Sequence, residues 1–176
     1  MSRIAGRFQQ LAAQGRTALI PYIVAGDPSQ DITVPLMHRM VESGADIIEI
    51  GVPFSDPMSE GPVIQQGHER ALANGMCLSR VLELVQEFRK SDDTTPLLLM
   101  GYANPVMHMG YAAFADAASA AGLDALLTVD IPPDEVDDIN AQLQRVGLDN
   151  NFLVPPPTPD ERITRIAAGA SGLIQS

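Results

Sequence analysis

Short apolar runs alternate with longer amphipathic stretches along the whole chain. The apolar runs predict six strands, at residues 18–24, 46–52, 96–102, 124–130, 151–155 and 171–176. The amphipathic stretches predict helices at residues 31–43, 62–73, 79–90 with Ser79 as N-cap, 111–121, 134–145 and 160–168. Regular alternation of this kind is typical of a parallel sheet that is covered by helices.

A short repeat supports this order of elements. Residues 42–46, 120–124 and 145–149 each end a predicted helix with glycine and lead through aspartate into an apolar run. Glycine at that point matches the left-handed position that follows many helices. Six such units fit either an open doubly wound sheet or most of an eight-stranded barrel, whose usual length is about 250 residues.

The barrel is favoured because the chain lacks the phosphate-binding sequences of the other fold class. No Gly-x-Gly-x-x-Gly turn follows the first strand, and no Gly-x-x-x-x-Gly-Lys-Ser/Thr sequence occurs. We therefore predict an α/β fold of the TIM type, a (βα)8 barrel. Residues 1–176 are expected to form one domain with about six βα units, without the two C-terminal ones.

Charge and composition exclude several classes of partner. The chain has 22 acidic and 11 basic residues and a net charge of -11, which argues against binding to nucleic acid or an anionic membrane. No apolar run reaches the roughly 18 residues of a membrane span. The first residues lack an apolar signal core, and the single Cys77 cannot form an internal disulfide, so a cytoplasmic location is expected. His38, His68 and His108 are scattered, and no metal site is predicted.

Glu49 is the strongest candidate for chemistry. Residues 47–53 read Ile-Ile-Glu-Ile-Gly-Val-Pro, and the other predicted strands before residue 156 contain no Lys or Arg that could pair with this carboxylate. A charge in an apolar strand is costly unless it is paired or neutralised, so we predict a raised pKa and a role as general acid or base. The alternatives are a carboxylate satisfied by backbone amides and a strand end that reaches solvent.

A second carboxylate, Glu60, lies in the loop that follows the same strand. Loops after parallel strands are where catalytic groups gather in barrels. Taken without its flanking sequence, Glu60 would be interpreted as a solvated loop acid beside the start of a helix.

Four segments together resemble the tryptophan synthase alpha subunit family. They are residues 21–28 (Pro-Tyr-Ile-Val-Ala-Gly-Asp-Pro), 44–57, 61–65 (Gly-Pro-Val-Ile-Gln) and 99–105 (Leu-Met-Gly-Tyr-Ala-Asn-Pro), and the resemblance extends over essentially the whole chain in one register. It implies a cytoplasmic lyase that cleaves indole-3-glycerol phosphate to indole and glyceraldehyde 3-phosphate by retro-aldol acid/base chemistry. It also implies a complex of two alpha and two beta subunits, and no cofactor.

The resemblance assigns roles residue by residue. Glu49 and Glu60 become the catalytic pair. The substrate-binding residues are expected to be Tyr22, Ile64, Met100, Tyr102, Leu127, Val129 and Leu153, each of which could also be ordinary barrel core. The surface for the beta subunit is expected to include Pro53, Asp56, Asn104, Pro105 and His108, the last three in a loop.

The chain departs from the family pattern at three places. The family usually has aspartate at the position of Glu60 and tyrosine at that of Gln175, and its sequence continues where this one stops, with the sixth loop, two more strands and the phosphate loops. We expect weaker substrate binding as a result, and self-association through the unpaired outer strands. A noncatalytic module that binds the beta subunit and tunes it stays open as an alternative.

Overall fold

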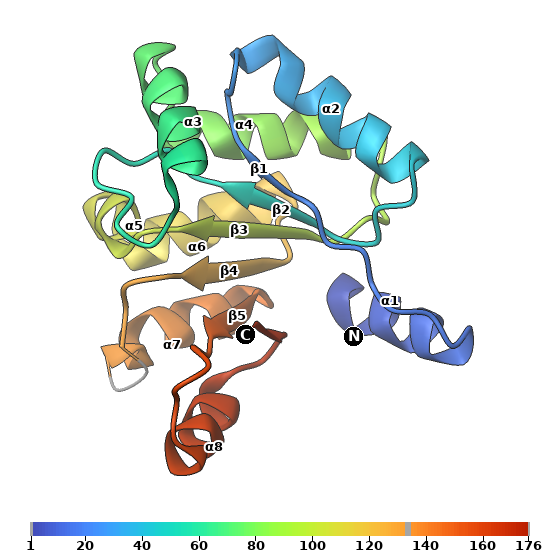
Figure 1. Cartoon of the computed structure of the whole chain (residues 1–176), viewed down its shortest axis with the longest axis vertical. Helices are drawn as coiled ribbons and strands as arrows, with labels where there is room; N and C mark the ends of the chain where they lie inside the picture. The colour runs from blue at the N-terminus through green and yellow to red at the C-terminus, as the bar shows by residue number, and fades with distance from the viewer. Residues whose placement is uncertain (1, 133–134, 176) are drawn as a thin grey trace.

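The six strands form one parallel sheet that curls into part of a barrel. The computed structural model describes residues 2–132 and 135–175. The strands are β1 (Tyr22–Val24), β2 (Ile48–Gly51), β3 (Leu97–Gly101), β4 (Ala125–Thr128), β5 (Asp149–Leu153) and β6 (Ile174–Gln175), and each pairs with the next in sequence. All five strand pairs are parallel, and the arrows of β2, β3 and β4 in Figure 1 point the same way, which confirms the predicted topology.

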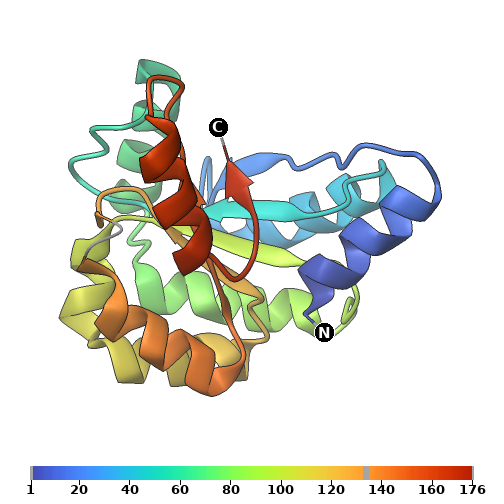
Figure 2. The same cartoon turned by 90° about the horizontal axis from the view of Figure 1, so that it is seen from below.

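Helices surround this sheet, and all but the first pack against its outer face. They are α1 (Arg3–Ala13), α2 (Gln30–Glu42), α3 (Pro62–Ala73), α4 (Leu78–Arg89), α5 (Ala103–Met109), α6 (Tyr111–Ala121), α7 (Asp137–Val146) and α8 (Asp160–Gly169). Figure 2 shows α4, α6 and α7 along one side of the sheet, and α2 packs against α4. This arrangement places the opposite face of the sheet toward the inside of the barrel.

Alternation along the strands divides the apolar side chains into two clusters. Ile48, Ile50 and Leu99 point outward and pack with the helices. The inner cluster contains Ile4, Ile47, Leu98, Ala125 and Leu127, with Ile20, Met100, Val129, Leu153 and Leu173 partly buried against it. Because successive strand residues face opposite sides, the near-continuous apolar runs fill both faces of the sheet.

Helix α1, which the sequence analysis did not predict, closes the amino-terminal end of the sheet. Its N-cap Ser2 accepts a hydrogen bond from the Ala5 amide at 3.3 Å, and Ile4 and Leu11 are its buried positions. Figure 1 shows α1 beyond the ends of the strands opposite to the arrowheads. Ile4 reaches the inner cluster from there, so α1 covers the bottom of the barrel.

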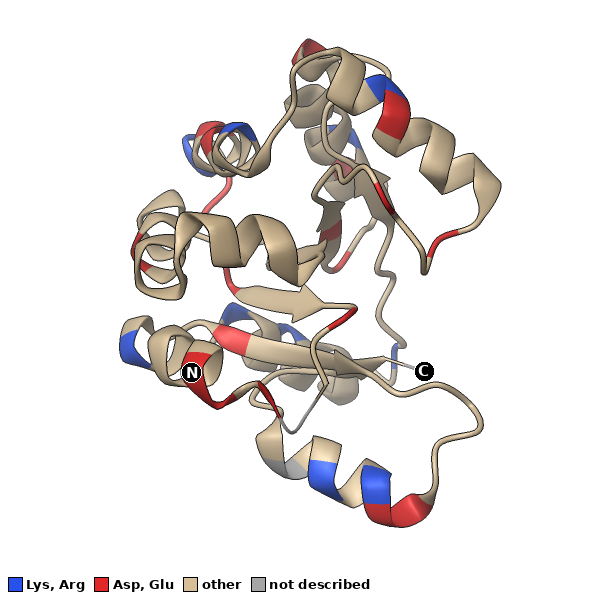
Figure 3. Cartoon of the chain, turned by 90° about the vertical axis from the view of Figure 1, so that its left-hand side faces the viewer, with Lys and Arg blue, Asp and Glu red and all other residues tan. Residues whose placement is uncertain are grey.

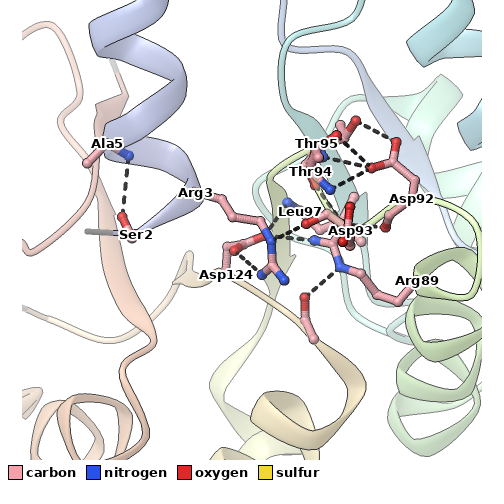
Figure 4. Close-up of polar contacts among 11 residues, drawn as sticks. Ser2, Arg3, Ala5, Arg89, Asp92, Asp93, Thr94, Thr95, Leu97 and Asp124 are labelled. Carbon is pink, nitrogen blue, oxygen red and sulfur yellow. Dashed lines mark hydrogen bonds and ion pairs between the residues drawn. The ribbon is translucent and has the colours of Figure 1, made fainter.

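Two aspartates of the repeat hold this end of the molecule together. Asp46 lies 3.3 Å from the Arg16 guanidinium and accepts a hydrogen bond from the Leu19 amide at 2.9 Å. Asp124 lies 2.8 Å from both Arg3 and Arg89 (Figure 4). The glycines before the strands, Gly44, Gly122 and Gly147, all have positive φ, as the repeat predicted.

Some helices and strands begin at other residues than the sequence predicted. Ser79 is not the N-cap: α4 begins at Leu78 after Cys77, and the Ser79 hydroxyl lies 3.2 Å from the Cys77 thiol. Regular pairing in β1 begins only at Tyr22, because Pro21 has no amide hydrogen to donate. The carbonyls of Leu19 and Pro21 still accept hydrogen bonds from amides of β2 and of the segment just before it. The predicted start of a helix at Asp134 lies outside the described residues, and α7 begins at Asp137.

The predicted loop around Asn104, Pro105 and His108 is instead helix α5. The Asp130 carboxylate, which follows β4, accepts a hydrogen bond from the Ala103 amide at 2.7 Å and satisfies one free donor of the first turn. Gly110, with φ of 88°, ends the helix. A contact between two segments far apart in sequence therefore starts a helix that local pattern did not indicate.

The charged residues lie mostly on helices and connections, as Figure 3 shows. None of the helices in the described part of the chain combines the length and the apolar character needed to cross a membrane. β1 and β6 are the outer strands of the sheet and do not pair with each other within the described ranges. Self-association through them stays a prediction.

Candidate active site

Glu49 lies on the inner face of the sheet among apolar side chains. Its Cα pairs with Tyr22 on β1 and with Leu98 on β3, and paired residues of parallel strands face the same side. The residue is 7 % exposed, and its inner-face neighbours belong to the apolar cluster of Leu98 and Leu127. No ion pair joins Glu49 to a Lys or Arg of the described chain.

Burial raises the pKa of Glu49 above its ordinary value, and a hydrogen bond from Gln175 works in the opposite direction. This rise in the pKa was predicted from the sequence, and burial, which removes the charged carboxylate from water, is the expected cause. A carboxyl group whose pKa is raised in this way can hold a proton closer to neutral pH, as a general acid requires.

Gln175 is the polar partner of Glu49. Its side-chain amide donates to Glu49 Oε1 at 3.3 Å, and its backbone carbonyl accepts from the Val154 amide at 2.7 Å. Gln175 pairs with Leu153 on β5, so it belongs to the inner face. A neutral donor at this position favours the ionised carboxylate.

Substitution Gln175→Leu is expected to raise the pKa of Glu49 further. The change removes the hydrogen bond that favours the charged form and leaves the burial that disfavours it. The measurement is a carboxyl ¹³C NMR titration of the parent and the variant. The exposed Gln86→Leu on α4 is the matched control and should leave the titration of Glu49 in place. A Glu49 titration that is unchanged or moves to lower pH in Gln175→Leu would contradict the role of this donor.

Glu60 is held in the loop after β2 by a phenol from the end of β3. Tyr102 donates its hydroxyl to Glu60 Oε2 and accepts a hydrogen bond from the Ser59 amide at 3.0 Å. Burial and the bond to Glu60 raise the pKa of Tyr102 to about 12, so the phenol keeps the proton that it donates. The longer side chain of Glu60, compared with aspartate, is therefore fixed in one direction by a buried partner.

The loop that carries Glu60 is tied to helix α3. The Gln65 side-chain amide donates to the carbonyls of Glu60 at 2.9 Å and Pro57 at 3.3 Å. Phe54, at the start of the loop, stacks on Tyr102 with ring centroids 4.9 Å apart. Pro62 at the first turn of α3 suits a position where no amide donor is needed. These contacts set the direction of Glu60 more firmly than a solvated loop acid would require.

The structure brings most of the predicted substrate residues together. Tyr22 pairs with Glu49, and the side chains on the inner face beside it are Met100, Leu127, Val129 and Leu153. Tyr102 is buried just beyond β3 and contacts Glu60. Ile64 is the exception, because it packs from α3 against the outer, helix-facing cluster. The Tyr22 ring also contacts that cluster and lines a groove with Ile64 and Val63, whereas its hydroxyl reaches Gly51 on the inner face.

A cavity of 610 Å³ opens beside this group of residues, at the carboxyl ends of β4 and β5. Its walls include Val129, Leu153 and Ser59, and Arg162 from α8. Glu49 and Glu60 are not among the residues that line it, although Ser59, the neighbour of Glu60 in sequence, is. The space is large enough for a flat bicyclic ligand.

The residues expected to face a partner differ in their accessibility. Asp56, Asn104 and His108 are exposed, and Pro105 is partly buried. Pro53 is buried within the chain, so its side chain is not offered to a partner surface. The large apolar side chains of Met58 and Met107 are exposed in the same two segments, at 81 % and 59 %.

Sequence reasoning missed one polar partner in the site. His68 on α3 was considered only as a metal ligand, yet its ring lies 3.4 Å from the Tyr22 hydroxyl and 3.0 Å from the Phe54 amide. No pattern in the sequence links residues 22, 54 and 68. Within residues 2–132 and 135–175, no three or more His, Cys, Asp or Glu side chains are grouped so that they could hold a metal ion.

Comparison with known proteins gives one consistent family. The sequence model described as "Tryptophan synthase alpha chain" matches residues 8–175. The tryptophan synthase alpha chain of Laribacter hongkongensis is 58 % identical over 174 residues, which cover 99 % of this chain and 66 % of the relative. That of Thioalkalivibrio sulfidiphilus is also 58 % identical and is covered to 65 %. The chain thus spans about two thirds of the length of the curated relatives that it matches.

Solved structures agree with the sequence relatives. The crystal structure of tryptophan synthase subunit alpha from Legionella pneumophila superposes with a TM-score of 0.96 and 47 % identity, covering 99 % of this chain and 66 % of that one. A structure of the tryptophan synthase α2β2 complex from Pyrococcus furiosus superposes with a TM-score of 0.85 and 38 % identity, over 89 % of this chain and 66 % of the other. These relatives share the barrel that the strand order describes.

Proposed function

This chain belongs to the tryptophan synthase alpha chain family, and we propose that it cleaves indole-3-glycerol phosphate to indole and glyceraldehyde 3-phosphate. The observation that carries the proposal is the buried carboxyl group of Glu49 on the inner face of the sheet, which forms no ion pair within the described residues. The reaction is a retro-aldol cleavage, which needs acid/base groups and no cofactor.

Glu49 supplies the acid/base function in this proposal. Cleavage protonates the indole carbon that bears the side chain, takes a proton from a glycerol hydroxyl, and breaks the bond between the two carbons. A carboxyl group with a raised pKa can give the first proton near neutral pH and accept the second. The apolar surroundings of Glu49, including Leu98 and Leu127, keep water away and suit an aromatic ring.

Glu60 stabilises the positive charge that develops at the ring nitrogen when the indole carbon is protonated. Its carboxylate is oriented by Tyr102, and a charge fixed before the reaction needs little reorganisation in the transition state. The two carboxylates thus take different tasks, because one is enclosed by apolar side chains while the other lies in a polar loop.

We further propose that the partner is a tryptophan synthase beta subunit, in a complex of two alpha and two beta chains in the cytoplasm. The Pyrococcus furiosus relative is described as such a complex. The exposed Asp56, Asn104 and His108, together with Met58 and Met107, offer a mixed polar and apolar surface at the catalytic end of the sheet.

The test is direct. The purified protein is incubated with indole-3-glycerol phosphate, with and without beta subunit, and indole is quantified by chromatography. Release of indole supports the lyase. A protein that binds the beta subunit and forms no indole would instead fit the noncatalytic alternative. A protein that neither forms indole nor binds the beta subunit would refute both the lyase and the noncatalytic module.

Substitution Glu60→Gln is expected to lower kcat/KM for indole formation by roughly tenfold to a hundredfold. The variant keeps the shape of the side chain and loses its charge, and a hydrogen bond to a charged group contributes roughly 1.5 to 3 kcal/mol. The exposed Glu69→Gln on α3 removes the same charge outside the site and should leave the rate unchanged. Equal rates in the two variants would remove Glu60 from the mechanism.

A further inference from the structure

The hydroxyl of Tyr22 occupies a defined place on the inner face of the sheet. Tyr22 pairs with Glu49, and its ring leans along the sheet until the hydroxyl lies 2.1 Å from the point where a Cβ on Gly51 would be. Gly51 has no side chain, so it leaves this space to the phenol. Because Gly51 follows Glu49 by two residues, the hydroxyl lies about 7 Å nearer to the carboxyl ends of the strands than the backbone of Glu49.

A buried histidine fixes the direction of this hydroxyl. His68 is 1 % exposed, and its Nδ1 accepts a hydrogen bond from the Phe54 amide at 3.0 Å. An accepting Nδ1 carries no proton, so the neutral ring must carry its proton on Nε2. Burial lowers the pKa of His68, which favours this neutral form. The Nε2 hydrogen then points to the Tyr22 oxygen, 3.4 Å away.

The hydrogen bond from His68 Nε2 to the Tyr22 oxygen leaves the hydroxyl hydrogen of Tyr22 without an acceptor in the described residues. The Tyr22 oxygen accepts from His68, so its own hydrogen must be donated elsewhere. Burial and the nearby Glu60 and Glu49 carboxylates raise the pKa of Tyr22, and the phenol therefore stays protonated. Within the described residues, the hydrogen bond to His68 is the one found for this hydroxyl. A polar hydrogen without a protein acceptor on this face of the sheet is a donor for a ligand.

We propose that the Tyr22 hydroxyl donates a hydrogen bond to an oxygen of the substrate's polyol chain, and that His68 is the positioning residue that directs it. The inference rests on the proposed function for the identity of the substrate. It deepens that function, because the pair distinguishes a ligand that carries a polyol from a bare indole ring. In this proposal the apolar side chains of the inner cluster contact the ring, and the phenol binds the polyol chain.

The first test is Tyr22→Phe, which removes only the hydroxyl. We expect kcat/KM for indole-3-glycerol phosphate to fall about five- to tenfold, the loss of one neutral hydrogen bond. Affinity for indole itself should not change. Binding is measured by calorimetry in the Glu49→Gln background, where cleavage does not interfere, with indole-3-glycerol phosphate and indole as the two probes.

The role of His68 is separated from simple packing by a double-mutant cycle. His68→Leu should lower kcat/KM as much as Tyr22→Phe does, and should have no further effect once Tyr22→Phe is present. A packing role would lower activity in both backgrounds. His68→Gln, which keeps a side-chain donor, should recover part of the loss. Thermal unfolding of each variant checks that the fold is kept.

¹⁵N NMR provides a readout that does not depend on turnover. His68 should appear as the neutral form protonated on Nε2, and Tyr22→Phe should shift the Nε2 resonance. A parent enzyme without indole formation would refute the proposed function, and the binding comparison would still decide this inference. Equal losses of affinity for both probes in Tyr22→Phe, an unchanged kcat/KM, or a ring protonated on Nδ1 would overturn it.

Discussion

Glu49→Gln is expected to lower the rate of indole formation by about a hundredfold to ten-thousandfold, the range that general acid/base catalysis contributes. Glutamine keeps the size of the side chain and its hydrogen-bonding capacity, but it cannot give or take the proton. The measurement is kcat and kcat/KM with indole-3-glycerol phosphate. Both should fall together, because the missing interaction belongs to the transition state. Full activity in this variant would remove Glu49 from its assigned role.

The same substitution should raise stability above neutral pH, which distinguishes loss of chemistry from loss of fold. Burial raises the pKa of Glu49 above 4.5, so the folded protein binds this proton more tightly than the unfolded chain does. The stability that this proton contributes is present below pH 4.5 and is lost as the pH rises through the folded pKa. Glutamine stays neutral throughout and avoids that loss.

Urea denaturation of parent and Glu49→Gln at pH 8 and near pH 4.5 tests this sign. The free energy of unfolding of the variant should exceed that of the parent at pH 8, and the difference should shrink toward pH 4.5. The exposed Glu69→Gln serves as control and should show no comparable dependence. A variant that is less stable than the parent at pH 8 would mean that the carboxylate is stabilised by its surroundings.

Asp124→Ala is expected to lower the free energy of unfolding by roughly 3 kcal/mol, the lower end of the cost of breaking a buried ion pair. The carboxylate is 4 % exposed and accepts from Arg3, from Arg89 and from the Leu97 amide, each at 2.8 Å (Figure 4). Alanine leaves the Arg89 guanidinium buried without its counter-charge. Carbonyl oxygens of Gly122 and Thr95 remain as acceptors, which is why the lower end of the range is expected.

The control is Asp116→Asn, which breaks the exposed pair with Arg145. Exposed pairs contribute about 0 to 1 kcal/mol, so this variant should unfold close to the parent. In urea, Asp124→Ala should shift the midpoint downward by roughly 1 to 2 M with the slope unchanged. Similar midpoints for the two variants would show that the Asp124 cluster contributes little to stability.

Local pattern was sufficient for much of the fold. The alternation of apolar runs with amphipathic stretches predicted all six strands of the sheet, and the glycines of the repeat marked three helix ends. These features depend on residues within a few positions of one another, which is why sequence alone reveals them. Two helices were missed. Helix α1 lies before the first predicted strand and outside the repeat. Helix α5 depends on a cap from Asp130, which follows β4.

The sequence by itself determined the fold class and the chemical character of Glu49, because an unpaired carboxylate in an apolar strand has a raised pKa in almost any packing. Only the tertiary structure decided how the other groups are directed. Tyr102 and Glu60 are 42 residues apart, Tyr22 and His68 are 46 apart, and Arg3 and Asp124 are 121 apart. Contacts over such separations depend on strand register and on the path of the loops, which no local pattern specifies.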